Sequence, residues 1–117
     1  MIKVVIGDRL GKGQAVAKGV EEAGGVAILI PGIGADMKLA DVMKKEDADL
    51  GISFCGSGGA GAITAQVKYD YSAAYGLNSI EAGIAALQEG KVVLGFTFMD
   101  EVELGRKMVE TLKALKK

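Results

Sequence analysis

Two repeating patterns of apolar and polar positions alternate along the chain. Short apolar runs rich in β-branched residues, without polar alternation, occupy residues 2–6, 26–30, 50–55, 72–75 and 91–98. Runs of this kind are typical of strands that are covered on both faces, as in a parallel sheet. The segments between them carry apolar residues three or four positions apart, which is the spacing of one face of a helix. The pattern therefore predicts five strands that alternate with five helices.

The predicted helices differ in how clearly their ends are marked. The last one is the clearest, because Val102, Met108 and Leu112 share one stripe, with acidic residues before it and lysines at its end, matching the helix dipole. The fourth helix is expected to open at Asn78, because Glu81 follows three residues later in an arrangement like a capping box. A third helix is expected over residues 60–67, where it begins inside a cluster of glycines.

Short connections between alternating strands and helices require a parallel sheet with right-handed crossovers. The expected fold is α/β, a three-layer doubly wound sandwich of the Rossmann-like kind around a five-stranded parallel sheet. The 117 residues are expected to form one domain, residues 1–117. Ligands bind beyond the carboxyl ends of the strands in such sheets. The segments after the first and third strands, residues 7–13 and 55–61, are therefore candidate sites.

Composition excludes several classes of function. Lys and Arg number 14 against 15 Asp and Glu, so a net charge of −1 offers no basic surface for nucleic acid or an anionic membrane. One cysteine and no histidine exclude a disulfide framework and a His/Cys zinc site, and we expect no metal and no cofactor. The longest apolar run, residues 26–30, is far shorter than the roughly 20 residues that cross a bilayer. Residues 1–6 are too short for a signal-peptide core, so a cytoplasmic protein is expected.

Glycine is in clear excess, with 18 residues where an average chain of this length has about eight. Residues 56–61, GSGGAG, fit the G-x-G-x-x-G pattern between a predicted strand and a predicted helix. A dinucleotide site would also need an acidic residue at the end of the next strand, and residues 75–78 contain none, so NAD is discounted. The glycines instead predict an anion site built from free backbone N–H groups at a helix N-terminus. Its ligand would be a phosphate, a carboxylate or an enediolate.

The polar residues near these two segments each allow two interpretations. Cys55 is either a small apolar residue at a strand end or a thiol whose pKa is lowered by the following helix N-terminus. Ser57 either binds the ligand or caps the helix. Asp8 either holds sugar hydroxyls and assists a proton transfer or caps a helix. Arg9 and Lys12 either meet a phosphate or remain solvated.

The residues around Cys55 resemble a known enzyme family. Residues 48–58, ADLGISFCGSG, are similar to the A-D-x-G-I-x-x-C-G-T-G signature of type B ribose-5-phosphate isomerases and galactose-6-phosphate isomerase subunits. Matches at residues 7–11, at residues 63–74 and in the last helix extend the resemblance over nearly the whole chain. The core SFCGS, residues 53–57, also resembles the hallmark of a small glycine-rich bacterial family named after those residues. The chain is identified as a member of that family, as a divergent branch of the isomerase fold.

This resemblance implies a role in carbohydrate metabolism and a part for each candidate residue. Cys55 would be the base that moves a proton between adjacent carbons of an open-chain sugar phosphate. Asp8 would bind substrate hydroxyls, and Ser57 stands where the family has threonine. The anion hole would be the backbone of Gly56, Gly58, Gly59, Ala60 and Gly61. The further candidates for ligand contact are Arg9, Lys12 and Asn78.

Departures from the family pattern leave three hypotheses open. Arg9 replaces a histidine that helps hold the phosphate, residues 76–79 lack the histidine used in ring opening, and the arginine-bearing C-terminal extension is absent. The chain is then an isomerase for a sugar phosphate that arrives in open form, or a non-catalytic sugar-phosphate binding or regulatory protein. The third hypothesis is a phosphocysteine carrier subunit of a sugar uptake system, which ranks last because such loops normally follow the first strand.

A homodimer is expected, because half of the residues are apolar in a small chain and because the isomerases share their site between subunits. Tyr69, Tyr71 and Tyr75 are candidates for the seam, although a buried strand position explains Tyr75 equally well.

Overall fold

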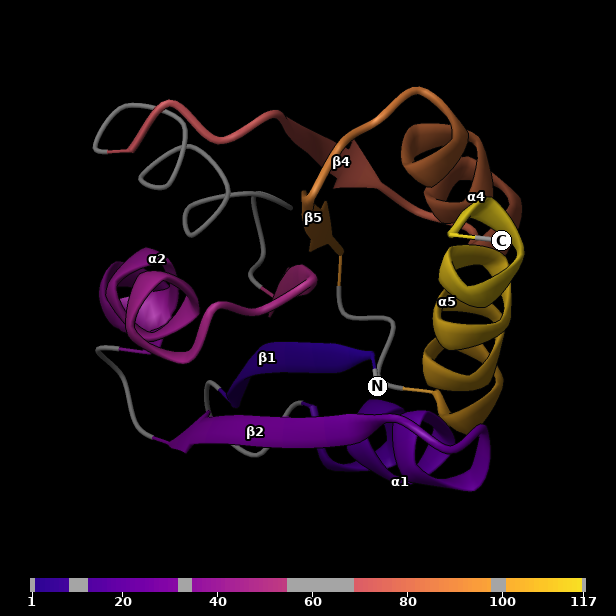
Figure 1. Ribbon diagram of the computed structural model, residues 1–117, viewed down its shortest axis with the longest axis horizontal. Coiled ribbons are helices and arrows are strands. Elements are labelled where there is room, and N and C mark those ends of the chain that lie inside the picture. The colour runs from indigo at the N-terminus through magenta and orange to yellow at the C-terminus, as the bar shows by residue number, and fades with distance from the viewer. Residues whose placement is uncertain (1, 9–12, 32–34, 55–68, 98–100, 117) are drawn as a thin grey trace.

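A five-stranded parallel sheet with helices on both faces forms the centre of the computed structural model (Figure 1). The structure describes residues 2–8, 13–31, 35–54, 69–97 and 101–116. The predicted doubly wound α/β fold is confirmed. No helix within these ranges is long and apolar enough to cross a membrane.

The elements follow one another as the sequence pattern predicts, and the helix expected over residues 60–67 lies outside the described residues. The strands are β1 Lys3–Asp8, β2 Val26–Pro31, β3 Leu50–Phe54, β4 Ala73–Leu77 and β5 Val93–Phe96. The helices in the described part are α1 Gln14–Glu22, α2 Ala35–Glu46, α4 Ile80–Gln88 and α5 Val102–Leu115.

The strands lie in the order β2-β1-β3-β5-β4. The chain moves outward from β1 to β2 and then crosses back to place β3 on the other side of β1. The direction of winding therefore reverses between β1 and β3, which makes the gap between their carboxyl ends the topological switch point of the sheet. In the second half the chain reaches the edge strand β4 first and returns to place β5 beside β3.

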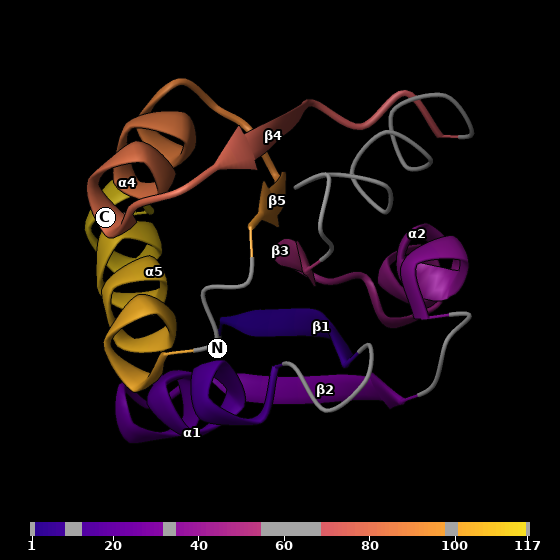
Figure 2. The ribbon, with the colours of Figure 1, turned by 180° about the vertical axis from the view of Figure 1, so that it is seen from behind.

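The described helices lie on both faces of the sheet. α1, α4 and α5 lie together over one face and α2 lies over the other, and the view from behind shows the same division (Figures 1 and 2). The position of β1 explains why its sequence is continuously apolar. Val4 and Ile6 belong to the core cluster on the side of α1, α4 and α5, whereas Val5 belongs to the cluster on the side of α2. Both faces of the strand are buried, as the uninterrupted pattern predicts.

The start of α4 corrects the predicted capping box. Ser79, not Asn78, is the N-cap residue, and the Ala82 N–H donates to the Ser79 Oγ at 3.1 Å. Ser79 has the extended backbone, φ −155° and ψ 159°, that aims a side chain at the first turn of a helix. The predicted N-cap residue, Asn78, therefore lies one residue before the observed N-cap residue, Ser79.

β4 also differs from its prediction, because it ends at Leu77 and leaves Tyr75 exposed. The pairing of β4 with β5 is irregular between Ala74 and Leu77, and Gly76 has a φ of +73°. Tyr75 is 54% exposed, so the interpretation of Tyr75 as a buried strand residue is wrong. In an irregular edge strand of this kind the side chains no longer alternate regularly between the two faces of the sheet.

Two glycines allow α1 and α5 to pack with their backbones in contact. A Cβ atom on Gly19 of α1 would overlap the carbonyl oxygen of Val102 at the start of α5. A Cβ atom on Gly105 of α5 would overlap the carbonyl oxygen of Val16 in α1. Each helix thus presents a glycine to the backbone of the other, and neither position has room for a side chain.

Replacing either glycine by alanine should lower the free energy of unfolding, measured by urea denaturation. The added methyl meets backbone, so Gly19→Ala and Gly105→Ala must move one helix against the other. We expect a net loss of about 1–3 kcal/mol, after a gain of about 1 kcal/mol in helix propensity.

The matched control is Gly83→Ala in α4, where the three atoms nearest to the methyl would all belong to side chains: the Phe96 Cζ at 2.8 Å, the Met108 Cε at 3.1 Å and the Met108 Sδ at 3.2 Å. Because side chains can adjust more easily than the helix backbone met at Gly19 and Gly105, Gly83→Ala should cost less. Equal losses at all three positions would contradict the backbone contact as the cause.

Candidate functional site

The carboxyl ends of β1 and β3 lie side by side at the switch point of the sheet. Val4 pairs with Leu50 and Ile6 pairs with Ile52, and beyond this last pair β1 continues for two residues to Asp8 and β3 for two residues to Phe54. Cys55 is the residue that follows Phe54 in the chain. The two segments that sequence analysis selected therefore leave neighbouring strands at the edge where doubly wound folds bind ligands.

Most of the predicted site residues lie outside the described residues: Arg9, Lys12, Cys55, Gly56, Ser57, Gly58, Gly59, Ala60 and Gly61. Asp8 is described as the last residue of β1, through its backbone only. Asn78 is exposed and directly follows β4. The grouping of Cys55, Asp8 and Ser57 as catalytic residues thus stays a prediction.

The strand order separates Asn78 from the end of β3. β5 lies between β3 and β4, so the residue that leaves the sheet next to β3 is Thr97, directly after β5. The Thr97 N–H donates to the Leu77 carbonyl at 2.9 Å, and the side chain is half-buried. Sequence analysis did not select Thr97, because the order of strands and helices along the chain does not determine which strands pair in the sheet.

Small residues form a row across the three central strands just below this edge. Ser53 of β3 is fully buried and pairs with Gly95 of β5. On the other side, Gly7 follows Ile6 in β1 just as Ser53 follows Ile52, the β3 partner of Ile6. A row of this kind lets a chain segment or a ligand approach the sheet closely.

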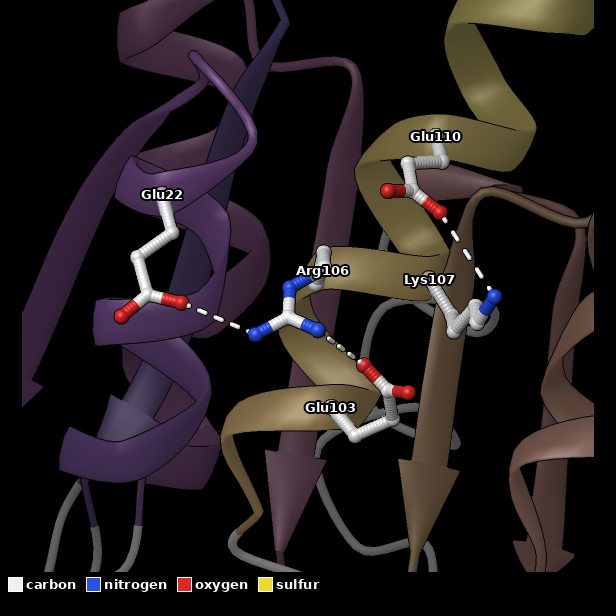
Figure 3. Close-up of polar contacts among 5 residues, drawn as sticks. All are labelled: Glu22, Glu103, Arg106, Lys107 and Glu110. Carbon is white, nitrogen blue, oxygen red and sulfur yellow. Dashed lines mark hydrogen bonds and ion pairs between the residues drawn. The ribbon is translucent and has the colours of Figure 1, made fainter.

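Several ion pairs between described residues lie on the helix surface and at the opposite edge of the sheet. On the surface, Arg106 of α5 bridges Glu22 of α1 at 3.0 Å and Glu103 at 2.8 Å, and Lys107 lies 3.7 Å from Glu110 (Figure 3). The hydrogen bond to Glu22 and the charge of Glu103 raise the pKa of Arg106. This network holds α1 against α5 from outside and has no part in the candidate site. The described segments contain no group of three or more acidic, His or Cys residues that could hold a metal ion.

Asp49 is the central charge at the amino edge of the sheet. The Lys3 backbone N–H donates to its Oδ2 at 2.8 Å, and Lys116 Nζ, beyond the end of α5, donates to its Oδ1 at 2.6 Å. Burial raises the pKa of Asp49, but the two hydrogen bonds and the charge of Lys116 outweigh burial, and the pKa is lowered overall. The ionised carboxylate therefore ties the start of β1 and the C-terminal helix to the residue before β3.

Asp49→Asn should destabilise the protein at neutral pH and have little effect in acid. A pKa lowered by folding means that the carboxylate stabilises the fold above its unfolded pKa near 3.8, and that this stabilisation is lost as pH falls through the folded-state pKa. We expect a loss of about 1 kcal/mol at pH 7 from urea unfolding.

The control is Asp47→Asn, which removes the same charge from an exposed residue two positions away. Asp47→Asn should leave the free energy of unfolding nearly unchanged. A difference between Asp49→Asn and the parent that persists at pH 2 would contradict the ionised pair.

Comparison with solved structures identifies the fold class. A type B ribose-5-phosphate isomerase from Mycoplasma genitalium, solved with bound ribulose-5-phosphate, has a TM-score of 0.71 at 18% identity, covering 96% of this chain and 83% of that chain. The enzyme from Trypanosoma brucei has a TM-score of 0.69 at 20% identity, covering 97% and 85%. The enzyme from Clostridium thermocellum has 0.67 at 23% identity, covering 94% and 82%. The chain thus has the fold of these isomerases.

The match to a protein family is more specific than the match in fold. The profile of the Glycine-rich SFCGS family matches residues 2–115, and the chain belongs to that family. No curated protein sequence matches the chain.

Proposed function

We propose that the chain binds an open-chain sugar phosphate at the carboxyl edge of its sheet and moves a proton between two adjacent carbons of the sugar. The observation that carries the proposal is the parallel pairing of β1 with β3 up to Ile6 and Ile52, after which β1 continues for two residues to Asp8 and β3 for two residues to Phe54, the residue before Cys55. This edge is the switch point of the sheet, where backbone and side chains from two strand ends meet one ligand. The similar fold that holds ribulose-5-phosphate in Mycoplasma genitalium supports the class of ligand.

The proposed reaction exchanges an aldose with a ketose. The Cys55 thiolate removes the proton from carbon 2, and the C–H electron pair forms the double bond between carbons 1 and 2 of an enediolate. The thiol returns the proton to carbon 1, and a second proton moves from the oxygen of carbon 2 to that of carbon 1. Reactants and products then balance without an external oxidant or reductant.

The neighbouring residues have separate parts in this proposal. Backbone N–H groups of residues 56–61 stabilise the enediolate oxygen, as donors aimed at developing charge do in other enzymes. Asp8 holds sugar hydroxyls, and Ser57 donates to the ligand. Arg9, Lys12 and Asn78 contact the ligand from the segments that follow β1 and β4.

A second candidate function is sugar-phosphate binding without turnover. The sequence has no histidine, so the side chain best suited to acid–base work near neutral pH is missing. Opening a sugar ring needs such a group, and each lost acid–base group typically costs about 10²–10⁴-fold in rate. A protein that senses or carries a sugar phosphate would keep the anion site alone.

Cys55→Ala should abolish proton exchange while sparing ligand binding. In heavy water the parent protein should exchange the hydrogen on carbon 2 of ribose 5-phosphate, and Cys55→Ala should slow this exchange at least about 100-fold because the base is gone. Proton NMR measures the exchange, and thermal shift with the same sugar phosphate measures binding. Because the chain has one cysteine, alkylation of the parent should have the same effect on exchange.

Gln88→Ala, at an exposed position at the end of α4, is the control and should keep the parent's exchange rate. Exchange that is equal in the parent and in Cys55→Ala would exclude Cys55 as the base. A parent protein that binds the sugar phosphate and exchanges nothing would instead favour the second candidate function.

We also propose that two copies of the chain form a dimer along the β4 edge. Tyr75 is 54% exposed on that edge strand, and Tyr71, two residues before β4, lies with its ring centroid 6.0 Å from that of Tyr69. Sedimentation should give about twice the 12.0 kDa chain mass. Tyr75→Lys should shift the protein to monomer, because it places two like charges at the interface, whereas Leu115→Lys on α5 should not. A parent that sediments as a monomer would refute the dimer.

A further inference from the structure

Thr97 leaves the sheet beside the point where the chain continues to Cys55. β5 is the neighbour of β3, and the last residues of the two strands, Phe96 and Phe54, are register partners. Thr97 is the next residue after Phe96, just as Cys55 is the next residue after Phe54. Neighbouring strands lie about 4.8 Å apart. Phe54 and Phe96 therefore lie at adjacent positions at the sheet edge, and Thr97 continues the chain from the second of them.

The two phenylalanine rings show that β3 and β5 keep the same register up to their last residues. Phe54 and Phe96 are both fully buried in the cluster under α1, α4 and α5, and their ring centroids lie 6.4 Å apart. Both side chains therefore point to the same face of the sheet. The ladder continues beyond Phe96 on its other side, where the Thr97 N–H donates to the Leu77 carbonyl at 2.9 Å. The backbone of Thr97 is thus held by the sheet.

The hydroxyl of the Thr97 side chain can make a hydrogen bond to a ligand. It is half-buried, and none of the hydrogen bonds made by the described residues involves the Thr97 hydroxyl. A hydroxyl both donates and accepts, so it suits a sugar oxygen that changes from carbonyl or hydroxyl to enediolate during the reaction. A fixed backbone gives such a group a defined position before the ligand arrives.

We infer that the Thr97 hydroxyl hydrogen-bonds the sugar phosphate at the oxygen next to the carbon that Cys55 deprotonates. This assignment rests on the proposed function and adds a ligand-contacting residue from β5, a strand whose end the candidate site otherwise leaves unused.

The test compares variants of Thr97 with one of Thr111, a second half-buried threonine that lies in α5. Thr97→Val removes the hydroxyl and keeps the branched shape, and should weaken ribose 5-phosphate binding about 10-fold in calorimetry. Thr97→Ser keeps the hydroxyl and should bind within about two-fold of the parent. Thr111→Val should bind like the parent, and inorganic phosphate should bind Thr97→Val as it binds the parent.

Equal affinity of the parent and Thr97→Val for ribose 5-phosphate would overturn the inference and leave the proposed function standing. An equal loss of affinity for inorganic phosphate would also overturn it, because the contact would then be to the phosphate group. A parent that binds no sugar phosphate would refute the proposed function and the inference together. If Thr97→Val does not fold, Thr97→Ala compared with Thr97→Ser isolates the hydroxyl, and equal binding by those two variants would overturn the inference.

Discussion

The pairing of β1 with β3 is the contact on which the rest of this protein depends. These strands are in the middle of the sheet, and their hydrogen bonds join the first strand to one that begins more than 40 residues later. The same ladder determines the core and the candidate site. It buries Val4 and Ile6 under the helices on one face, and it brings the carboxyl ends of two strands together where the winding direction reverses.

The helices reinforce this arrangement at a distance from the site. Gly19 and Gly105 let α1 and α5 touch through their backbones, so an early and the last helix act as one layer over the sheet. Ion pairs between described residues lie on the outside of that layer and at the amino edge, where Asp49 joins Lys3 and Lys116. Just below the carboxyl edge the three central strands instead carry small residues, which suits a ligand bound through backbone groups.

The chain shares its fold with the isomerases. Its own chemistry has to be argued from its own residues. A shared fold at about 20% identity leaves the reaction open, because one scaffold supports different sites. In the proposed reaction, the absence of histidine leaves the acid–base work to the Cys55 thiol and to neighbouring hydroxyls and carboxylates. Such a site suits a substrate that is already in open form, or a ligand that is bound without being changed.

Sequence alone determined the properties that depend on neighbours along the chain. Strands buried on both faces, amphipathic helices, the glycine-rich segment after the third strand and family membership all follow from local patterns. Only the tertiary structure decided which strands pair, and hence that Thr97 rather than Asn78 leaves the sheet next to β3. It also decided that Ser79 caps α4 and that Tyr75 is exposed on an irregular edge. These outcomes depend on backbone dihedrals and on hydrogen bonds between residues distant in the chain, and a one-dimensional pattern of side chains contains neither.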